Sequence, residues 1–280
     1  PRWLLSKGRL KECRKVLQKI EPENTVNDLI GQMEVEIEKD RNSAVGWRYL
    51  MQPWLRTPLM IAVCIMFFQQ FVGINTVIYY SPKIFLMAGF ESTLSAIWAS
   101  VGIGIVNVVF TVISLYLVDR IGRRKLYFIG LSGIAFSVLC LSACFIYANQ
   151  LGEIGRWLMV IFMFGYVAFF AISIGPLGWL VISEIFPQKV RGLGTSIGSL
   201  AVWIFNCIVS FTFFKIIDFF SIPGTEIVVG QTTSENPAGA FFLYGFIAVL
   251  GLVWGYLFLP ETKGLSLEEI EQKWRKNREC

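Results

Sequence analysis

The sequence predicts an all-α membrane protein, a six-transmembrane-helix bundle with short cytoplasmic helices. Of its 280 residues, 55% are hydrophobic and only 16% are charged. Charged residues are absent from six long stretches, namely residues 57–82, 92–118, 126–152, 157–183, 192–214 and 236–260. A bilayer core needs about 20 apolar residues per helix, and the core helices of soluble proteins seldom reach that length without a charge. This distribution excludes a soluble enzyme.

Residues 1–56 are charged and predict two short amphipathic helices outside the hydrocarbon. Apolar residues recur at helical spacing before and after a turn at residues 21–22. These residues are Leu10, Cys13, Leu17 and Ile20, then Val26, Leu29, Met33 and Ile37. A solvated linker without these helices is the alternative.

The six spans are predicted at about residues 57–82, 92–118, 126–148, 157–183, 192–218 and 238–260. The loop at residues 119–125 carries four basic residues and the turn at 188–191 carries two. The rule that positive charge stays inside then places both termini in the cytoplasm, as an even number of spans requires. We expect a multi-pass protein of the plasma membrane, or of the inner membrane of a bacterium.

Metal and nucleic-acid chemistry find no support in the composition. The sequence has no histidine, and its six cysteines lack the paired spacing of a metal knuckle. The net charge of +5 lies in loops flanking the spans and reflects topology. We therefore expect no metal, no cofactor and no nucleic-acid partner.

Polar side chains within the first span are candidates for a binding site, because a polar group in hydrocarbon costs free energy unless it is partnered. Gln69, Gln70 and Asn75 lie there. On a straight helix the side chains of Gln70 and Asn75 would point about 140° apart. They converge only if the helix breaks, and Gly73 predicts that break. Hydrogen bonding between helices is the alternative role.

The fourth span predicts a second hinge at Gly175, Pro176 and Gly178, because Pro176 removes a helix hydrogen bond. Trp179 follows this hinge, and Trp203 lies in the middle of the fifth span. An indole facing a cavity offers a flat apolar wall and one N–H donor, which suit the C–H face of a sugar ring. Packing against lipid or core is the alternative.

Asn107 in the second span and Asn206 in the fifth complete the predicted site. Amides both donate and accept hydrogen bonds, as hydroxyl groups require. An ionic substrate would call for a counter-charge that these spans lack. The predicted ligand is therefore a neutral polyhydroxylated solute.

Charged residues gather at the cytoplasmic ends of the spans and predict an ion-pair network that forms in one conformation and separates in another. The network consists of Asp119, Arg120, Arg123, Arg124, Glu184, Arg191 and Glu261. Each arginine has a simpler interpretation as a topology signal, but acidic residues contribute little to topology and so favour pairing.

Several motifs, taken in order, resemble the sugar porter family of the major facilitator superfamily. They are Pro1–Leu4, Gln69-Gln70 with Gly73-Ile74-Asn75 and Tyr79-Tyr80, Asp119–Arg124, Gly175-Pro176 with Trp179 and Glu184–Pro187, Arg191-Gly192, and Pro260–Gly264. The resemblance covers essentially all of the chain. Gly178 and Met66 depart from residues common in the family, which leaves hinge stiffness and sugar preference open.

The resemblance implies spans seven to twelve of a twelve-span transporter, with an amino-terminal six-span half as partner. Residues 1–56 would then be the cytoplasmic helical linker between the halves, and residues 261–280 a cytoplasmic tail with a helix at Ser266–Lys276. The chain begins at Pro1 with neither an initiator Met nor a signal peptide, and we expect it to be the later part of a longer protein. The amides and indoles named above would bind sugar, Tyr79 and Tyr80 would occlude it from outside, and the charged network would form an inner gate. Proton coupling would depend on the amino-terminal half.

We therefore expect transport of a neutral monosaccharide, a hexose or a pentose, by alternating access, either as facilitated diffusion or as proton symport. Two alternatives share the same spans: a transporter of a polyol such as inositol, and a sugar sensor that does not transport. A membrane enzyme is disfavoured, because the uncharged spans offer no acid pair, metal set or histidine.

Overall fold

The computed structural model describes residues 1–19, 22–42, 50–90, 92–187, 190–221, 227–229 and 232–264. Six helical segments of these residues are long and apolar enough to cross a membrane. The predicted all-α, six-span class is confirmed. One short hairpin is added, in which β1 (Ile227–Val229) pairs antiparallel with β2 (Thr232–Ser234). The predicted tail helix falls largely outside the described residues.

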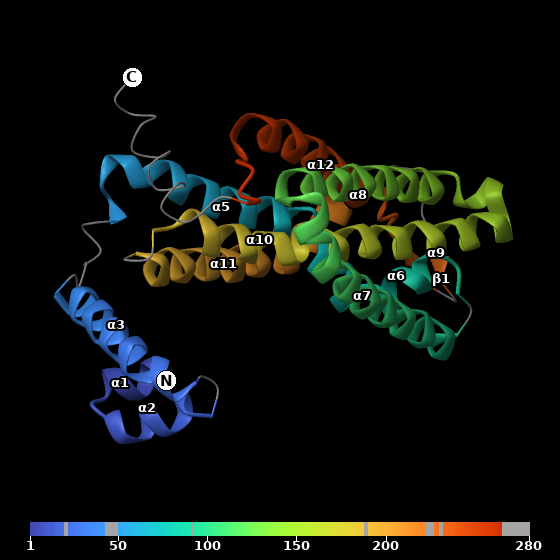
Figure 1. Cartoon of the computed structure of the whole chain (residues 1–280). Coiled ribbons are helices and arrows are strands. Elements are labelled where there is room, and N and C mark those ends of the chain that lie inside the picture. Colours follow the sequence, from blue (N-terminus) through green and yellow to red (C-terminus); the bar gives the residue numbers. More distant parts are fainter. Residues whose placement is uncertain are drawn as a thin grey trace.

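The amino-terminal segment folds into a small cluster of its own, apart from the membrane bundle (Figure 1). Its described residues form three helices where two were predicted, namely α1 (Arg2–Ser6), α2 (Leu10–Leu17) and α3 (Glu23–Asn42). Cys13, Leu17 and Val26 are buried at their interface, as the helical spacing predicted. Leu10 instead points outward.

Two of the six spans are broken helices. The first consists of α5 (Arg56–Phe71), entered through the short 3-10 turn η1 (Pro53–Leu55), and α6 (Ile74–Met87). The fourth consists of α9 (Ala148–Ile172) and α10 (Ile174–Ile185). The first span continues past Pro82, which the helix accommodates, and the fourth begins before residue 157 with a kink at Gly152.

The other four spans are continuous helices: α7 (Thr93–Ile121), α8 (Arg123–Ile146), α11 (Arg191–Phe219) and α12 (Ala238–Phe258). α8 packs between α9 and α12, and α11 lies along α5 (Figure 1). Glycines allow these close approaches. A Cβ added at Gly255 of α12, for example, would lie 2.4 Å from the Tyr127 ring of α8.

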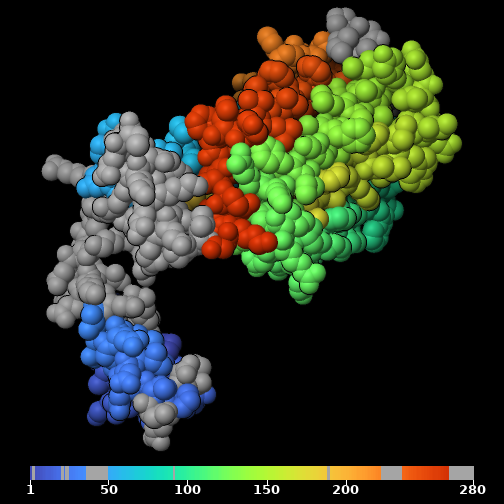
Figure 2. Space-filling model, turned by 45° about the horizontal axis from the view of Figure 1, so that its top comes forward, coloured from blue at the N-terminus to red at the C-terminus, as the bar shows by residue number. Residues whose placement is uncertain are grey.

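The outside of the bundle is apolar. Val108 and Leu115 on α7 and Phe211 on α11 are 65%, 63% and 81% exposed. Exposed apolar surface of this extent is typical of proteins that contact lipid or another membrane domain. Figure 2 shows one face of this bundle beside the separate amino-terminal cluster.

Candidate functional site

The first span breaks where the sequence predicted, between Val72 and Gly73. Gly73 has φ 86°, in the left-handed region that glycine adopts most readily. An added Cβ would lie 2.3 Å from the Tyr244 ring, so space also restricts this position to glycine. Beyond the break, Asn75 Nδ2 donates to Gln70 Oε1 at 2.6 Å. The break therefore does bring these two amides together.

Three amides form a continuous line of hydrogen bonds, which we call the amide site: Gln69, Gln70 and Asn75. Gln70 Nε2 donates to Gln69 Oε1 at 3.1 Å. Gln69 Nε2 in turn donates to the carbonyl oxygens of Ile174 at 3.1 Å and Gly175 at 2.8 Å. The line thus crosses from the first broken span to the first turn of α10. Within the described residues, Asn75 Oδ1 accepts no hydrogen bond and remains open to a ligand.

The second break lies at Ser173 and not at the predicted Gly175-Pro176 pair. Ser173 has φ −127° and ψ −103°, and its Oγ donates to Phe169 O at 2.6 Å. Pro176 falls in the first turn of α10, where its missing N–H costs little. Gly175 and Gly178 have helical backbones and act as contact points: an added Cβ at Gly178 would lie 2.9 Å from Gln69 Nε2.

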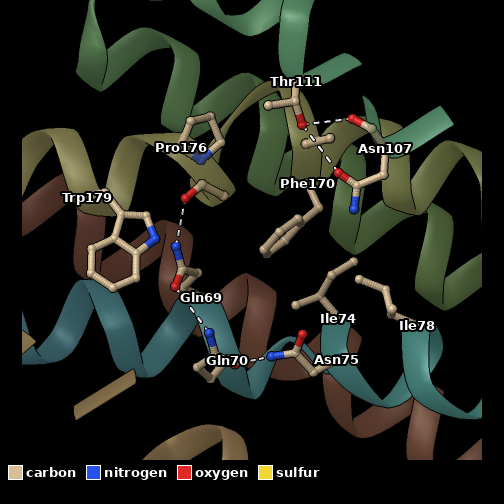
Figure 3. Close-up of a pocket in the computed structure, with 12 residues that line it drawn as sticks. Gln69, Gln70, Ile74, Asn75, Ile78, Asn107, Thr111, Phe170, Pro176 and Trp179 are labelled. Atoms are coloured by element: carbon tan, nitrogen blue, oxygen red, sulfur yellow. Dashed lines mark hydrogen bonds between the residues drawn. The ribbon is translucent and has the colours of Figure 1, made fainter. Parts of the chain in front are cut away.

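A cavity of about 340 Å³ opens where the two broken spans meet α7. It is lined by Gln69, Gln70, Ile74, Asn75, Ile78, Asn107, Thr111, Phe170, Ala171, Gly175, Pro176 and Trp179. Figure 3 shows Asn107 and Thr111 across the Phe170 ring from Gln70 and Asn75. Ligand cavities of proteins commonly measure about 300–1,000 Å³, so a small solute fits.

The chemistry of this cavity is neutral and polar, with apolar walls. The Trp179 side chain is 46% exposed, and its indole N–H has no partner among the described residues. Asn107 Oδ1 accepts from Thr111 Oγ1 at 3.2 Å. The Asn107 amide N–H groups have no hydrogen-bond partner among the described residues. None of the lining residues is ionisable. Unpaired donors and acceptors on neutral groups suit a hydroxyl-rich ligand.

Sequence reasoning did not identify Thr111, Phe170, Ala171 and Ile78 as site residues, and it named Ile74 only within a family motif. Thr111 lies four residues after Asn107, on the same face of α7, so helical spacing could have found it. The apolar residues carry no pattern that separates a cavity wall from ordinary packing.

Two predicted site residues on α11 do not line this cavity. Trp203 is 66% exposed on the outer face of α11. Asn206 is buried against α6, where its Nδ2 donates to Tyr79 Oη at 3.3 Å and its Oδ1 accepts from Ser210. The reason is the rotation of α11, which turns Phe205 against Phe67 and Phe71 of α5. Their contact with sugar remains a prediction for an assembled transporter.

The two predicted outer-gate tyrosines have different surroundings. Tyr79 is 53% exposed. Tyr80 packs between α6 and α11, with its ring stacked on Phe213 at 5.5 Å and its hydroxyl donating to Ser210 O at 3.4 Å. Tyr79 is therefore more exposed than Tyr80, which packs α6 against α11, and a gating role for either tyrosine remains a prediction.

At the far end of the bundle, Arg123 bonds two carboxylates. Its guanidinium lies 2.8 Å from Glu184 of α10 and 3.2 Å from Asp119 of α7. Thr262 Oγ1 donates to the other oxygen of Glu184 at 2.5 Å. Together with Glu261, these residues form what we call the charge cluster.

Glu261 caps the start of α8. Its carboxylate accepts from the backbone N–H groups of Arg123 at 3.0 Å and Arg124 at 3.2 Å, where a helix N-terminus favours negative charge. Lys263 Nζ donates to Arg120 O at the end of α7. The segment after α12 is thus fixed across the α7–α8 turn.

The remaining predicted gate arginines are placed differently. Arg124 donates to Tyr256 O at 2.7 Å. The Arg120 side chain is exposed and makes no ion pair within the described residues. Arg191 Nε and Nη2 are buried, without a hydrogen-bond partner in the part of the chain that the structure describes. The predicted network is therefore partly assembled within this chain.

Comparisons with known proteins identify the family. The family model described as "Sugar (and other) transporter" matches residues 1–274. The chain belongs to this family. It is 34% identical over 274 residues to the D-xylose-proton symporter of Escherichia coli strain K12, covering 98% of this chain and 52% of the symporter. It is 33% identical to the probable polyol transporter 3 of Arabidopsis thaliana, covering 97% of this chain and 54% of that protein.

A solved structure agrees with this assignment. The proton:xylose symporter XylE bound to 6-bromo-6-deoxy-D-glucose matches with a TM-score of 0.71 and 32% identity, covering 98% of this chain and 54% of that one. The chain thus spans about half the length of the relatives it matches. Family and apolar helices together make it an integral, multi-pass membrane protein.

Proposed function

We propose that this chain forms one half of a transporter that carries a neutral monosaccharide across the membrane by alternating access. The observation that carries the proposal is the cavity at the two helix breaks, with its uncharged amides and one indole. Broken helices at the binding site are typical of transporters. A hexose or pentose presents hydroxyl groups to the amides and a C–H face to Trp179.

The charge cluster is proposed as the inner gate. It lies at the cytoplasmic end if both termini are cytoplasmic, as the distribution of basic residues favours. In a two-half transporter, an amino-terminal half would contact this end in one state and leave it in the other. Arg191 would take part in such a contact, because its Nε and Nη2 have no hydrogen-bond partner among the described residues.

The experiment is uptake of radiolabelled monosaccharide into proteoliposomes, with the chain alone and with it joined to a matching amino-terminal half. We expect saturable uptake only in the joined form, and its loss in Gln70→Ala. Uptake that is driven by an imposed pH gradient would identify proton symport. Uptake that does not respond to a pH gradient would identify facilitated diffusion. A joined form that binds sugar but moves none would favour the sensor.

A polyol substrate is the second candidate, supported by the similarity to a probable polyol transporter. Competition with unlabelled inositol, xylose and glucose in the same vesicles distinguishes these classes. If inositol inhibits uptake at concentrations where the sugars have no effect, the substrate is a polyol and not a monosaccharide.

A further inference from the structure

Tyr166 of α9 is fully buried and contacts the first break. Its hydroxyl donates to Val72 O at 2.9 Å, at the end of α5. A carbonyl at the end of a helix has lost its intrahelical partner and needs another. Among the described residues, no backbone N–H is bonded to Val72 O. Tyr166 therefore supplies the hydrogen bond that the break removes.

The opposite bond runs from the first span to the second break. Gln69 lies on α5, a few residues before the first break, and donates to the carbonyls of Ile174 and Gly175 directly after Ser173. Tyr166 lies on α9 before the second break and donates to the first. Each broken span therefore donates a side-chain hydrogen bond to the backbone at the break of the other.

We propose that Tyr166 is a positioning residue for the amide site, and that with Gln69 it couples the two breaks so that they move as one unit. If Val72 loses its bond to Tyr166, the end of α5 turns. The Gln70–Asn75 bond spans that same point, so it is strained with it. Gln69 moves with the end of α5 and shifts the first turn of α10, and Trp179 in the second turn of that helix follows.

The chain offers a matched control in Tyr127. It is also fully buried, and its hydroxyl donates to a backbone carbonyl, Gly251 O, at 3.0 Å. That bond joins α8 to α12, both continuous helices. Tyr127→Phe therefore removes a bond of the same kind and burial without touching a break.

The first test is hydrogen exchange of backbone amides in the 280-residue chain in lipid nanodiscs. In Tyr166→Phe we expect exchange about three- to tenfold faster at the amides of residues 72–77 and also at those of residues 174, 175 and 177–179, since one net hydrogen bond is lost. Tyr127→Phe should leave both segments unchanged. Faster exchange at 72–77 alone, or equal effects of the two variants, would overturn the coupling.

A double-variant cycle tests reciprocity. Gln69→Met keeps the length of the side chain and removes its hydrogen bonds. Losing either the Tyr166 bond or the Gln69 bonds already uncouples the breaks. The double variant, Tyr166→Phe with Gln69→Met, should therefore exchange its backbone amides little faster than the single variant with the stronger effect. Additive effects would contradict the proposal.

The second test rests on the proposed function. In the joined transporter, Tyr166→Phe should raise the KM for sugar about three- to tenfold, while Tyr127→Phe leaves it unchanged. An unchanged KM in Tyr166→Phe would refute the positioning role. If the unmodified joined form moves no sugar, the proposed function fails, whereas the exchange experiment still decides the coupling.

Discussion

In the cavity, Asn75 Oδ1, the Asn107 amide N–H groups and the Trp179 indole N–H have no partners among the described residues. In the charge cluster, both oxygens of Glu184 and both of Glu261 accept hydrogen bonds from the chain itself. A binding site needs open positions, whereas a fixed contact needs none. The comparison separates polar groups that are open to a ligand from polar groups that are paired within this chain.

The largest expected effect is that of Gly73→Ala, which tests whether the amide site depends on its break. The left-handed backbone and the overlap with the Tyr244 ring together should cost about 4 kcal/mol. Reversible unfolding in detergent and SDS measures this free energy. Gly104→Ala is the control, because nothing lies within 4 Å of its added Cβ. Equal stability of the two variants would mean that the break is not required.

Arg123→Gln tests the charge cluster. Side-chain exposures of 12% for Arg123 and 20% for Glu184 indicate a largely desolvated pair. Removing one partner of such a pair should destabilise the chain by about 3 kcal/mol. The same unfolding assay applies, with the exposed Arg120→Gln as control. A loss below about 1 kcal/mol would show that the cluster is solvated and weak.

Gly178→Ala should displace the Gln69 amide without disturbing the charge cluster. The loss of one net hydrogen bond, about 1 kcal/mol, corresponds to a roughly fivefold rise in sugar KM. Gly198→Ala on α11 is the control, because its added Cβ meets only the end of Ile182, at 2.6 Å. An unchanged KM in Gly178→Ala would place the Gln69 amide outside the binding contacts.

Tyr79→Phe should have the smallest effect. Its hydroxyl accepts one long bond, 3.3 Å from Asn206, and an outer gate would use the ring to cover the ligand. We expect less than a twofold change in uptake. Tyr79→Ala, which removes the ring, should reduce uptake clearly. Equal behaviour of the two variants would contradict the gating role.

The six spans were predictable because a stretch without charge is a property of sequence alone. The first break was predictable for a similar reason, since Gly73 stands between amides that a straight helix would separate. The second break was misplaced because its cause is tertiary. Ser173 packs against Gly130 of α8 so closely that an added Cβ there would lie 1.7 Å from Ser173 Oγ.

The positions of Trp203 and Asn206 were not predictable either. Their spacing on α11 places them on neighbouring faces, but it does not say which face meets α5. That orientation follows from aromatic packing between Phe205 and Phe67, which no local pattern specifies. The partners of Glu261 are likewise backbone N–H groups far away in sequence.

The cavity without ionisable residues has an electrical consequence. A membrane voltage of 100 mV does about 2.3 kcal/mol of work on each elementary charge that crosses the membrane. None of the residues lining this cavity carries such a charge. In the proposed transporter, the walls of this cavity would transfer no charge through the field, whichever side the cavity faced. The cavity lining itself should therefore add no voltage dependence to the binding of a neutral solute.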